Sequence, residues 1–300
     1  MEDNDCKLIE IKQKLPGFNQ FIGSWLYRGD IDFVVDVGPA SSVFRLIDAL
    51  TEMNIETIDY VFLTHIHIDH AGGLARFLEH FPMAKVICHE KGIKHLVEPK
   101  KLWEGSVKVL GKISEIYGRL SPVEEKYFIS QNDIFNKDIV VIETPGHASH
   151  HLSFVYNGNL FVGEAGGNYL RFQGEDYLRP ATPPRFHLTT FLNSIETLIQ
   201  LEDMQICYAH FGKADSSHEM LKRNRDQILN WEKIIHRELS PDANNLIERC
   251  VKRLLSEDPE LNAFLHMESI VQKRELFFLQ NSIKGYLQYL ESKTKVSNLD

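Results

Sequence analysis

THIHIDHAGG, residues 64–73, places three histidines and one aspartate within six positions: His65, His67, Asp69 and His70. The apolar run Tyr60–Leu63 comes directly before this segment, and an amphipathic helical pattern follows it. A core strand would bury these polar side chains at a high free-energy cost, whereas a turn at the end of a strand can gather them around a metal ion. The segment therefore predicts a metal site at the end of a buried strand.

Three further candidate ligands each follow a predicted strand. They are His147 in Thr144-Pro145-Gly146-His147, Glu164 in Phe161-Val162-Gly163-Glu164, and His210 in Ala209-His210-Phe211-Gly212. The neighbouring glycines let the backbone turn sharply and bring a side chain close to a metal. With the first cluster they make seven candidates, enough for two ions. Imidazole and carboxylate suit zinc, iron or manganese, whereas calcium prefers oxygen ligands alone.

This pattern, His-x-His-x-Asp-His at residues 65–70 followed by later ligand candidates, resembles the metallo-β-lactamase superfamily over about residues 18–213. The resemblance implies an α/β fold, a four-layer αββα sandwich with the metal site at one edge. The ligands that it implies are His65, His67 and His147 for one metal, and Asp69, His70 and His210 for the second. It also implies that Asp36 and His151 support these ligands without binding metal themselves.

One position departs from the family pattern. Where the family places an aspartate that bridges both metals, this chain has Glu164, followed by Ala165-Gly166-Gly167. Three outcomes are open: Glu164 bridges because the glycines let the backbone retreat, it binds one metal only, or it swings away and leaves a weaker second site. We expect Glu164 to remain a ligand. The expected cofactor is two divalent metal ions, with zinc first and iron or manganese as alternatives.

A dinuclear centre predicts hydrolysis. Two cations roughly 3.5–4 Å apart lower the pKa of a shared water from near 16 toward about 7. We therefore expect a metal-bound hydroxide to attack a small ester, thioester, lactone or phosphoester, with Asp69 orienting the nucleophile or carrying its proton. Two alternatives stay open: a mononuclear iron oxidoreductase similar to the persulfide dioxygenases, and a noncatalytic metal-binding protein whose helical tail makes a regulatory contact.

Substrate selection is expected in residues 168–187, because this segment directly follows the glutamate. Tyr169, Arg171, Tyr177 and Arg179 are the candidates for binding a substrate carboxylate or phosphate. Arginine presents a fork of donors to such groups. Surface ion pairing is the alternative for each arginine.

The chain divides near residue 215. Before it, short β-rich runs alternate with helical patterns, which is typical of a layered α/β domain. We expect a metal-binding domain over residues 1–215, with a helical insertion at about 91–130 that either overhangs the site or forms a surface hairpin. The predicted strands are Phe33–Val37, Tyr60–Leu63, Lys85–Cys88, Ile139–Glu143, Ser153–Tyr156 and Asn159–Val162, the last two joined through Asn157-Gly158 as a tight hairpin. The predicted helices are Val43–Met53 and Leu74–His80.

Residues 216–300 are predicted to form an all-α extension. Ser240-Pro241-Asp242 and Asp258-Pro259-Glu260 have the pattern of helix starts. An apolar stripe at helical spacing runs through Leu276, Leu279, Ile283, Tyr286, Leu287 and Leu290. This stripe either packs on the first domain or forms a homodimer interface.

Composition bears on partners and location. Lysine and arginine number 33 against 42 acidic residues, a net charge of −9, so the chain has no general attraction for nucleic acid or anionic membranes. The start, MEDNDCKLIEIKQKLPGF, lacks the pattern of a secretory signal, and no apolar run approaches the length of a membrane span. We expect a cytoplasmic protein that acts on a small molecule, with neither nucleic acid nor membrane as partner.

Overall fold

A computed structural model describes residues 5–134, 136–239 and 245–297. Its contacts divide the chain into two compact units. The first holds residues 1–143, 150–163 and 209–211, and the second holds residues 144–149, 164–208 and 212–300. The predicted helix start at Ser240-Pro241-Asp242 lies outside the described residues. The expected domain division after residue 215 stays a prediction.

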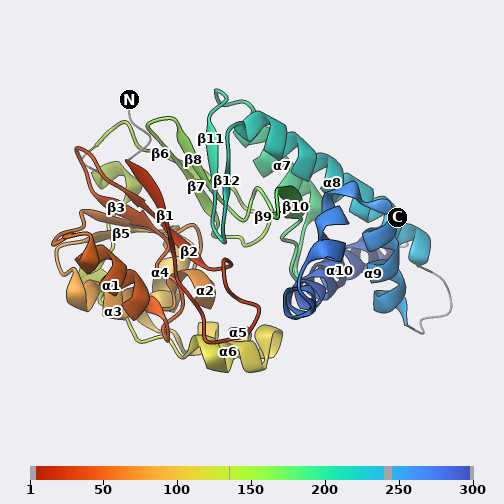
Figure 1. Cartoon of the computed structure of the whole chain (residues 1–300), viewed down its shortest axis with the longest axis horizontal. Helices are drawn as coiled ribbons and strands as arrows, with labels where there is room; N and C mark the ends of the chain where they lie inside the picture. Colours follow the sequence, from red (N-terminus) through yellow and green to blue (C-terminus); the bar gives the residue numbers. More distant parts are fainter. Residues whose placement is uncertain (1–4, 135, 240–244, 298–300) are drawn as a thin grey trace. The chain divides into compact units, whose positions relative to one another are not determined.

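The first unit contains a mixed five-stranded sheet (Figure 1). Its strands, in spatial order, are β1 (Cys6–Glu10), β2 (Gly23–Tyr27), β3 (Phe33–Val35), β4 (Tyr60–Phe62) and β5 (Lys85–Ile87). The β1–β2–β3 pairs are antiparallel, and β3–β4–β5 are parallel. Parallel neighbours need crossover connections. Helices α1 (Val43–Glu52) and α3 (Leu74–His80) lie in these connections and bury one apolar face each.

A second set of strands in this unit is antiparallel: β6 (Val140–Glu143), β7 (Leu152–Tyr156) and β8 (Asn159–Gly163). The predicted Asn157-Gly158 hairpin is confirmed, because both residues have positive φ, 45° and 72°, as a type I′ turn requires. Aromatic side chains join these strands to the first sheet. The ring centroids of Phe62 and Phe154 lie 4.9 Å apart. The core of the first unit therefore lies between two sheets.

The insertion expected at residues 91–130 is helical over much of its length. It includes α4 (Glu90–Val97), α5 (Lys100–Leu110) and α6 (Lys112–Tyr117), and the 3₁₀ turns η1 (Glu125–Tyr127) and η2 (Gln131–Asp133) follow. Tyr117 is fully buried, whereas α5 buries none of its residues. The role of this insertion as a cover for the site stays a prediction.

The second unit begins its regular structure with a hairpin that sequence patterns did not predict. Strands β9 (Asn168–Phe172) and β10 (Glu175–Arg179) pair antiparallel around Gln173 and Gly174, which have φ values of 50° and 90°. Gln-Gly is a weaker turn signal than Asn-Gly, and charged residues interrupt the apolar alternation of both strands. The unit continues with α7 (Leu188–Ile199), β11 (Gln205–Tyr208) and β12 (Lys213–Ala214).

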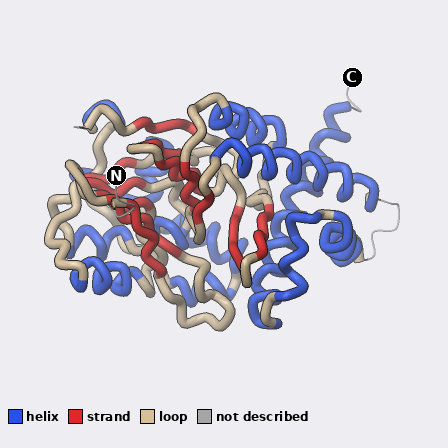
Figure 2. Tube along the Cα trace, turned by 45° about the horizontal axis from the view of Figure 1, so that its top comes forward, coloured by secondary structure: helices blue, strands red, loops and turns tan. Residues whose placement is uncertain are grey.

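From Ser217 on, the described residues of the second unit are mainly helical, as predicted (Figure 2). It comprises α8 (Ser217–Glu238), α9 (Leu246–Glu257), η3 (Pro259–His266) and α10 (Ser269–Ser297). The predicted helix start at residue 258 is confirmed, since the Asp258 carboxylate accepts a hydrogen bond from Glu260 N, although the helix is 3₁₀. The apolar stripe of α10 packs within the chain: Tyr286 is fully buried and donates to Ile228 O at 3.0 Å. The homodimer stays a prediction.

Helix α10 runs for 29 residues, a length that would suffice to cross a bilayer. Its sequence does not allow this, because Lys273, Arg274 and Glu275 lie in succession along it. No helix of the described part of the chain is both long and apolar enough to span a membrane.

A buried ion pair connects α10 to β10. Arg179 Nε lies 2.7 Å from Glu275 Oε2, and Arg274 Nε lies 2.7 Å from Glu275 Oε1. The side chains of Arg179 and Glu275 are 2% and 0% exposed. Burial alone would raise the pKa of Glu275, but the two arginines outweigh it and hold that pKa below the ordinary value of 4.5.

Replacing Glu275 with alanine should lower the free energy of unfolding by about 3–5 kcal/mol, because it leaves Arg179 buried without its counter-ion. Urea titration measures the change. Since the pKa of Glu275 is lowered in the fold, its contribution is present above the unfolded pKa and is lost as the pH falls through the folded pKa. The difference between wild type and variant should therefore shrink in acid.

The control is Glu196→Ala, which removes an ion pair with Arg225 on the surface, where Glu196 is 48% exposed. It should cost less than about 1 kcal/mol. Equal stabilities of the two variants at neutral pH would contradict the role given to Glu275.

Candidate metal centre

Asp36 organises the strand ends of the first unit. It follows β3, and Thr64 follows the parallel neighbour β4, so the two residues meet at the same sheet edge. Asp36 Oδ1 accepts from Thr64 N, and Oδ2 accepts from Thr64 Oγ1, both at 2.8 Å. His70 Nδ1 lies 2.9 Å from the same Oδ2. Asp36 is 1% exposed, and these donors satisfy its buried charge.

These contacts determine which ring nitrogen of His65 and of His70 carries the proton. Thr64 Oγ1 donates to Asp36, so it accepts from His65 Nδ1, 3.0 Å away. Asp36 accepts from His70 Nδ1. With the proton on Nδ1, the lone pair of each ring is on Nε2. Metal-binding histidines characteristically donate their other ring N–H in this way.

His210 and His147 follow the same rule. His210 Nδ1 lies 3.2 Å from Phe21 O in the first unit, and His147 Nδ1 lies 3.0 Å from Ala181 O in the second. A backbone carbonyl can only accept, so each Nδ1 donates, and Nε2 is the ring nitrogen left for a metal. Four of the predicted ligands therefore present the same nitrogen.

Asp69, His70 and His210 form a compact group in the first unit. Each offers one ligand atom, and these atoms lie within 4.8 Å of one another. Helix α2 (Ile68–Ala71) carries the first two, and His70 O accepts from Val37 N at 2.8 Å, which fixes the helix against the end of β3. Asp69 is the most exposed of the three, with a side chain that is 13% accessible.

His65 and His67 lie beside this group. Their ring centroids are 4.5 Å apart, and the centroid of His151 is 5.3 Å from that of His65. His151 is fully buried. Gly163 makes room for it, since a Cβ at that position would lie 2.3 Å from His151 Nε2. His151 therefore lies next to a predicted ligand.

In the second unit, Glu164 is directed at His147. Its Oε2 lies 2.7 Å from His147 Nε2, and its Oε1 accepts from Asn168 Nδ2 at 3.3 Å. Both ligand candidates have side chains that are 7% exposed. The extra methylene of glutamate thus does not turn the carboxylate away from the histidine.

The donor set fits divalent cations. The candidate metal ligands of the structure are His65, His67, Asp69, His70, His147, Glu164 and His210. These are imidazole nitrogens and carboxylate oxygens, which suit zinc, iron and manganese. The anchored Nδ1 atoms are the support that such ligands require.

The four predicted substrate-binding residues do not share one face of the β9–β10 hairpin. The register pairs Arg171 with Asp176 and Tyr169 with Leu178, so Tyr169 and Arg171 lie on one face, and Tyr177 and Arg179 on the other. Tyr169 donates to Asp176 Oδ1 at 2.7 Å, and burial, aided by this bond, raises its pKa to about 12. Tyr177 is fully buried. Only Arg171 is exposed, and substrate binding by these residues stays a prediction.

Two supporting residues, Thr64 and Asn168, have no signal in the local sequence. Thr64 belongs to the motif segment, but a hydroxyl is not a typical ligand of these metals, and its bonds depend on the neighbouring strand. Asn168 lies four residues after Glu164, and only the turn between them brings its amide to the carboxylate. No local pattern signals either role.

Comparisons with known proteins agree with this geometry. The family model described as "Metallo-beta-lactamase superfamily" matches residues 21–210. A metallo-beta-lactamase fold-containing protein of Sulfurisphaera tokodaii is 32% identical over 212 residues, 67% of this chain and 76% of that protein. A hydroxyacylglutathione hydrolase of Salmonella typhi is 26% identical over 261 residues, 82% of this chain and 86% of that enzyme.

The fold has solved counterparts. The crystal structure of an archaeal metallo-beta-lactamase superfamily protein from Sulfolobus tokodaii has a TM-score of 0.69 at 24% identity, and the match covers 94% of this chain and 98% of that one. The predicted αββα fold with a helical C-terminal extension is therefore confirmed.

Replacing Thr64 with valine should weaken zinc binding by about 10–100-fold, because it removes the hydroxyl that joins His65 to Asp36. Competition with a chromophoric chelator measures the affinity. Thr64→Ser keeps the hydroxyl and should bind zinc within about threefold of wild type. Unchanged affinity in the valine variant would show that this hydrogen bond does not support the ligand.

Proposed function

The chain belongs to the metallo-β-lactamase superfamily, and on that premise we propose that it is a dinuclear metal-dependent hydrolase of a small thioester or related acyl ester. The observation that carries the proposal is the cluster of Asp69, His70 and His210, whose ligand atoms lie within 4.8 Å. Asp36 holds the central histidine of this cluster at 2.9 Å. Polar side chains with a purely structural role do not require three ligand atoms to converge in this way.

In this proposal each metal takes three histidine or aspartate ligands. His65, His67 and His147 hold one ion, and Asp69, His70 and His210 hold the other. Glu164 binds at least the ion held by His147, because its Oε2 lies 2.7 Å from His147 Nε2. The anchored Nδ1 atoms of His65, His70, His147 and His210 support this assignment.

Divalent cations at these ligands supply a water of lowered pKa and a Lewis acid for the substrate carbonyl. The protein needs in addition a group that carries a proton. Asp69 fits this role, because its carboxylate is the most exposed of its cluster. A buried carboxylate such as Asp36 is fully engaged in hydrogen bonds and serves to orient the histidines.

A thioester suits these residues. A thiol has a pKa of about 8.5, so a thiolate leaves with little help from an acid, and one proton carrier suffices. The similarity to a hydroxyacylglutathione hydrolase, which by its name acts on a thioester of glutathione, supports the same class. The net charge of −9 disfavours polyanionic phosphoesters.

The test combines metal content with activity. Protein purified without added metal is analysed for its elements and assayed on a hydroxyacyl thioester, an aryl ester and a lactone. We expect two metals per chain in wild type, falling toward one in Glu164→Ala and retained in Glu164→Asp. Asp69→Asn should lower kcat for the thioester by at least about 10²-fold, which is the loss expected when a proton carrier is removed.

Glu52→Gln provides the control, since it neutralises an exposed carboxylate on α1 of the same unit and should leave metal content and kcat unchanged. A single iron per chain that is unaffected by Glu164→Ala, together with oxygen consumption on a persulfide, would instead support the dioxygenase alternative. Fully metallated protein without hydrolysis of any of the three substrates would overturn the proposed function.

A further inference from the structure

The turn that carries Glu164 is formed by residues 164–167, directly before β9. Gly167 N donates to Glu164 O at 3.1 Å and closes the turn. Gly167 has a φ of 80°, a conformation that favours glycine. The backbone of the ligand is thus set by a short turn whose last residue must be small.

Asn224 of α8 fills the space beside this turn. It is fully buried, and its Nδ2 donates to Ala165 O at 3.1 Å. The carbonyl can only accept, which fixes the orientation of the amide. A Cβ at Gly167 would lie 2.8 Å from Asn224 Oδ1 and 2.8 Å from Arg179 O. The absence of a side chain at Gly167 therefore lets the Asn224 amide reach the turn.

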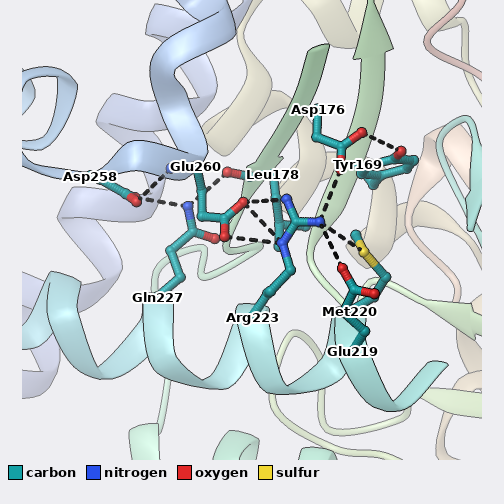
Figure 3. Close-up of polar contacts among 9 residues, drawn as sticks. All are labelled: Tyr169, Asp176, Leu178, Glu219, Met220, Arg223, Gln227, Asp258 and Glu260. Carbon is teal, nitrogen blue, oxygen red and sulfur yellow. Dashed lines mark hydrogen bonds and ion pairs between the residues drawn. The ribbon is translucent and has the colours of Figure 1, made fainter. Parts of the chain in front are cut away.

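The next turn of the same helix holds a different part of the second unit. Gln227 Nε2 donates to Leu178 O of β10 at 2.7 Å and to Asp258 Oδ2 at 2.8 Å (Figure 3). Gln227 is 3% exposed, nearly as buried as Asn224. The two amides are thus alike in burial and in bonding to backbone carbonyls. They differ in what they hold: Gln227 also donates to the Asp258 carboxylate, whereas Asn224 donates to the turn that carries Glu164.

We propose that Asn224 is a positioning residue for the Glu164 ligand, acting through the backbone of residues 164–167. The inference rests on the proposed function, in which Glu164 binds metal. A glutamate has one more rotatable bond than aspartate and loses more conformational entropy when it is fixed. Asn168 holds the carboxylate of Glu164, and Asn224 holds its turn, so both ends of the longer side chain are constrained.

Under this proposal the helical extension is part of the metal centre. A metal binds more tightly when the turn that carries its ligand is already ordered, because less conformational entropy is lost on binding. Loss of the Asn224 amide should thus weaken metal binding beyond its effect on folding. A purely structural asparagine would change only the stability of the fold.

The experiment compares Asn224→Ala with Gln227→Ala. Thermal unfolding of the chelator-treated proteins measures their stability without metal, and competition with a chromophoric chelator measures the affinity for each zinc. Both variants should unfold at lower temperature than wild type. Only Asn224→Ala should lose affinity for the zinc bound by Glu164, by at least about tenfold, while Gln227→Ala stays within about threefold of wild type.

Asn224→Asp provides a second variant of nearly the same shape. It removes the donor to Ala165 O and should weaken zinc binding as the alanine variant does, with a smaller change in packing. Gly167→Ala places a methyl group too close to the Oδ1 atom of the same amide. The double variant Gly167→Ala/Asn224→Ala should therefore lose less affinity than the sum of the two single losses, because both changes disrupt the contact of Asn224 with the turn. The strained φ and the approach to Arg179 O contribute to the Gly167→Ala loss alone.

The outcomes separate the two proposals. Wild type that binds no zinc overturns the proposed function and this inference with it. Wild type that binds zinc, together with Asn224 variants that bind it equally well or lose no more than Gln227→Ala, overturns the inference alone. Fully additive losses in the double variant would also overturn it.

Discussion

The hydrogen bonds to the Asp36 carboxylate are the constraint on which the ligand candidates of the first unit depend. An unpaired carboxylate at 1% exposure would be costly. Asp36 avoids this cost by accepting from the backbone and hydroxyl of Thr64 and from His70 Nδ1. These donors come from the end of β4 and from α2, so one charge fixes both segments. Its φ of 59° is a conformation that aspartate tolerates better than most residues.

The Glu164 ligand candidate of the second unit has a different physical basis. Its turn is held by Asn224, and its carboxylate by Asn168. Helix α10 adds the ion pair of Glu275 with Arg179, which fixes β10 in the same unit. The longer ligand is thus supported by one residue nearby in the sequence, Asn168, and by one distant residue, Asn224.

Local patterns were sufficient for the parts of the structure that depend on local chemistry. The spacing of His65, His67, Asp69 and His70 predicted a cluster of candidate ligands, and Asn157-Gly158 predicted a turn, because each signal lies within a few residues. The β9–β10 hairpin was missed since Gln173-Gly174 is an uncommon pair for that turn. The ion pair of Arg179 gave no local signal, because its partner Glu275 is 96 residues away. Asn224, 59 residues from the carbonyl that it binds, gave no local signal.

The long-range bonds also bear on what the C-terminal helices do. Ala165 O, Leu178 O and Pro180 O accept from Asn224, Gln227 and Ser282, respectively. Without these helices, buried carbonyls of the hairpin and the ligand turn would lose their donors, and each loss is costly where water is absent. Arg179 would lose Glu275, the buried carboxylate that pairs with it. The helices therefore complete the hydrogen bonding of the segment that bears Glu164, which an appendage packed only through apolar contacts would not do.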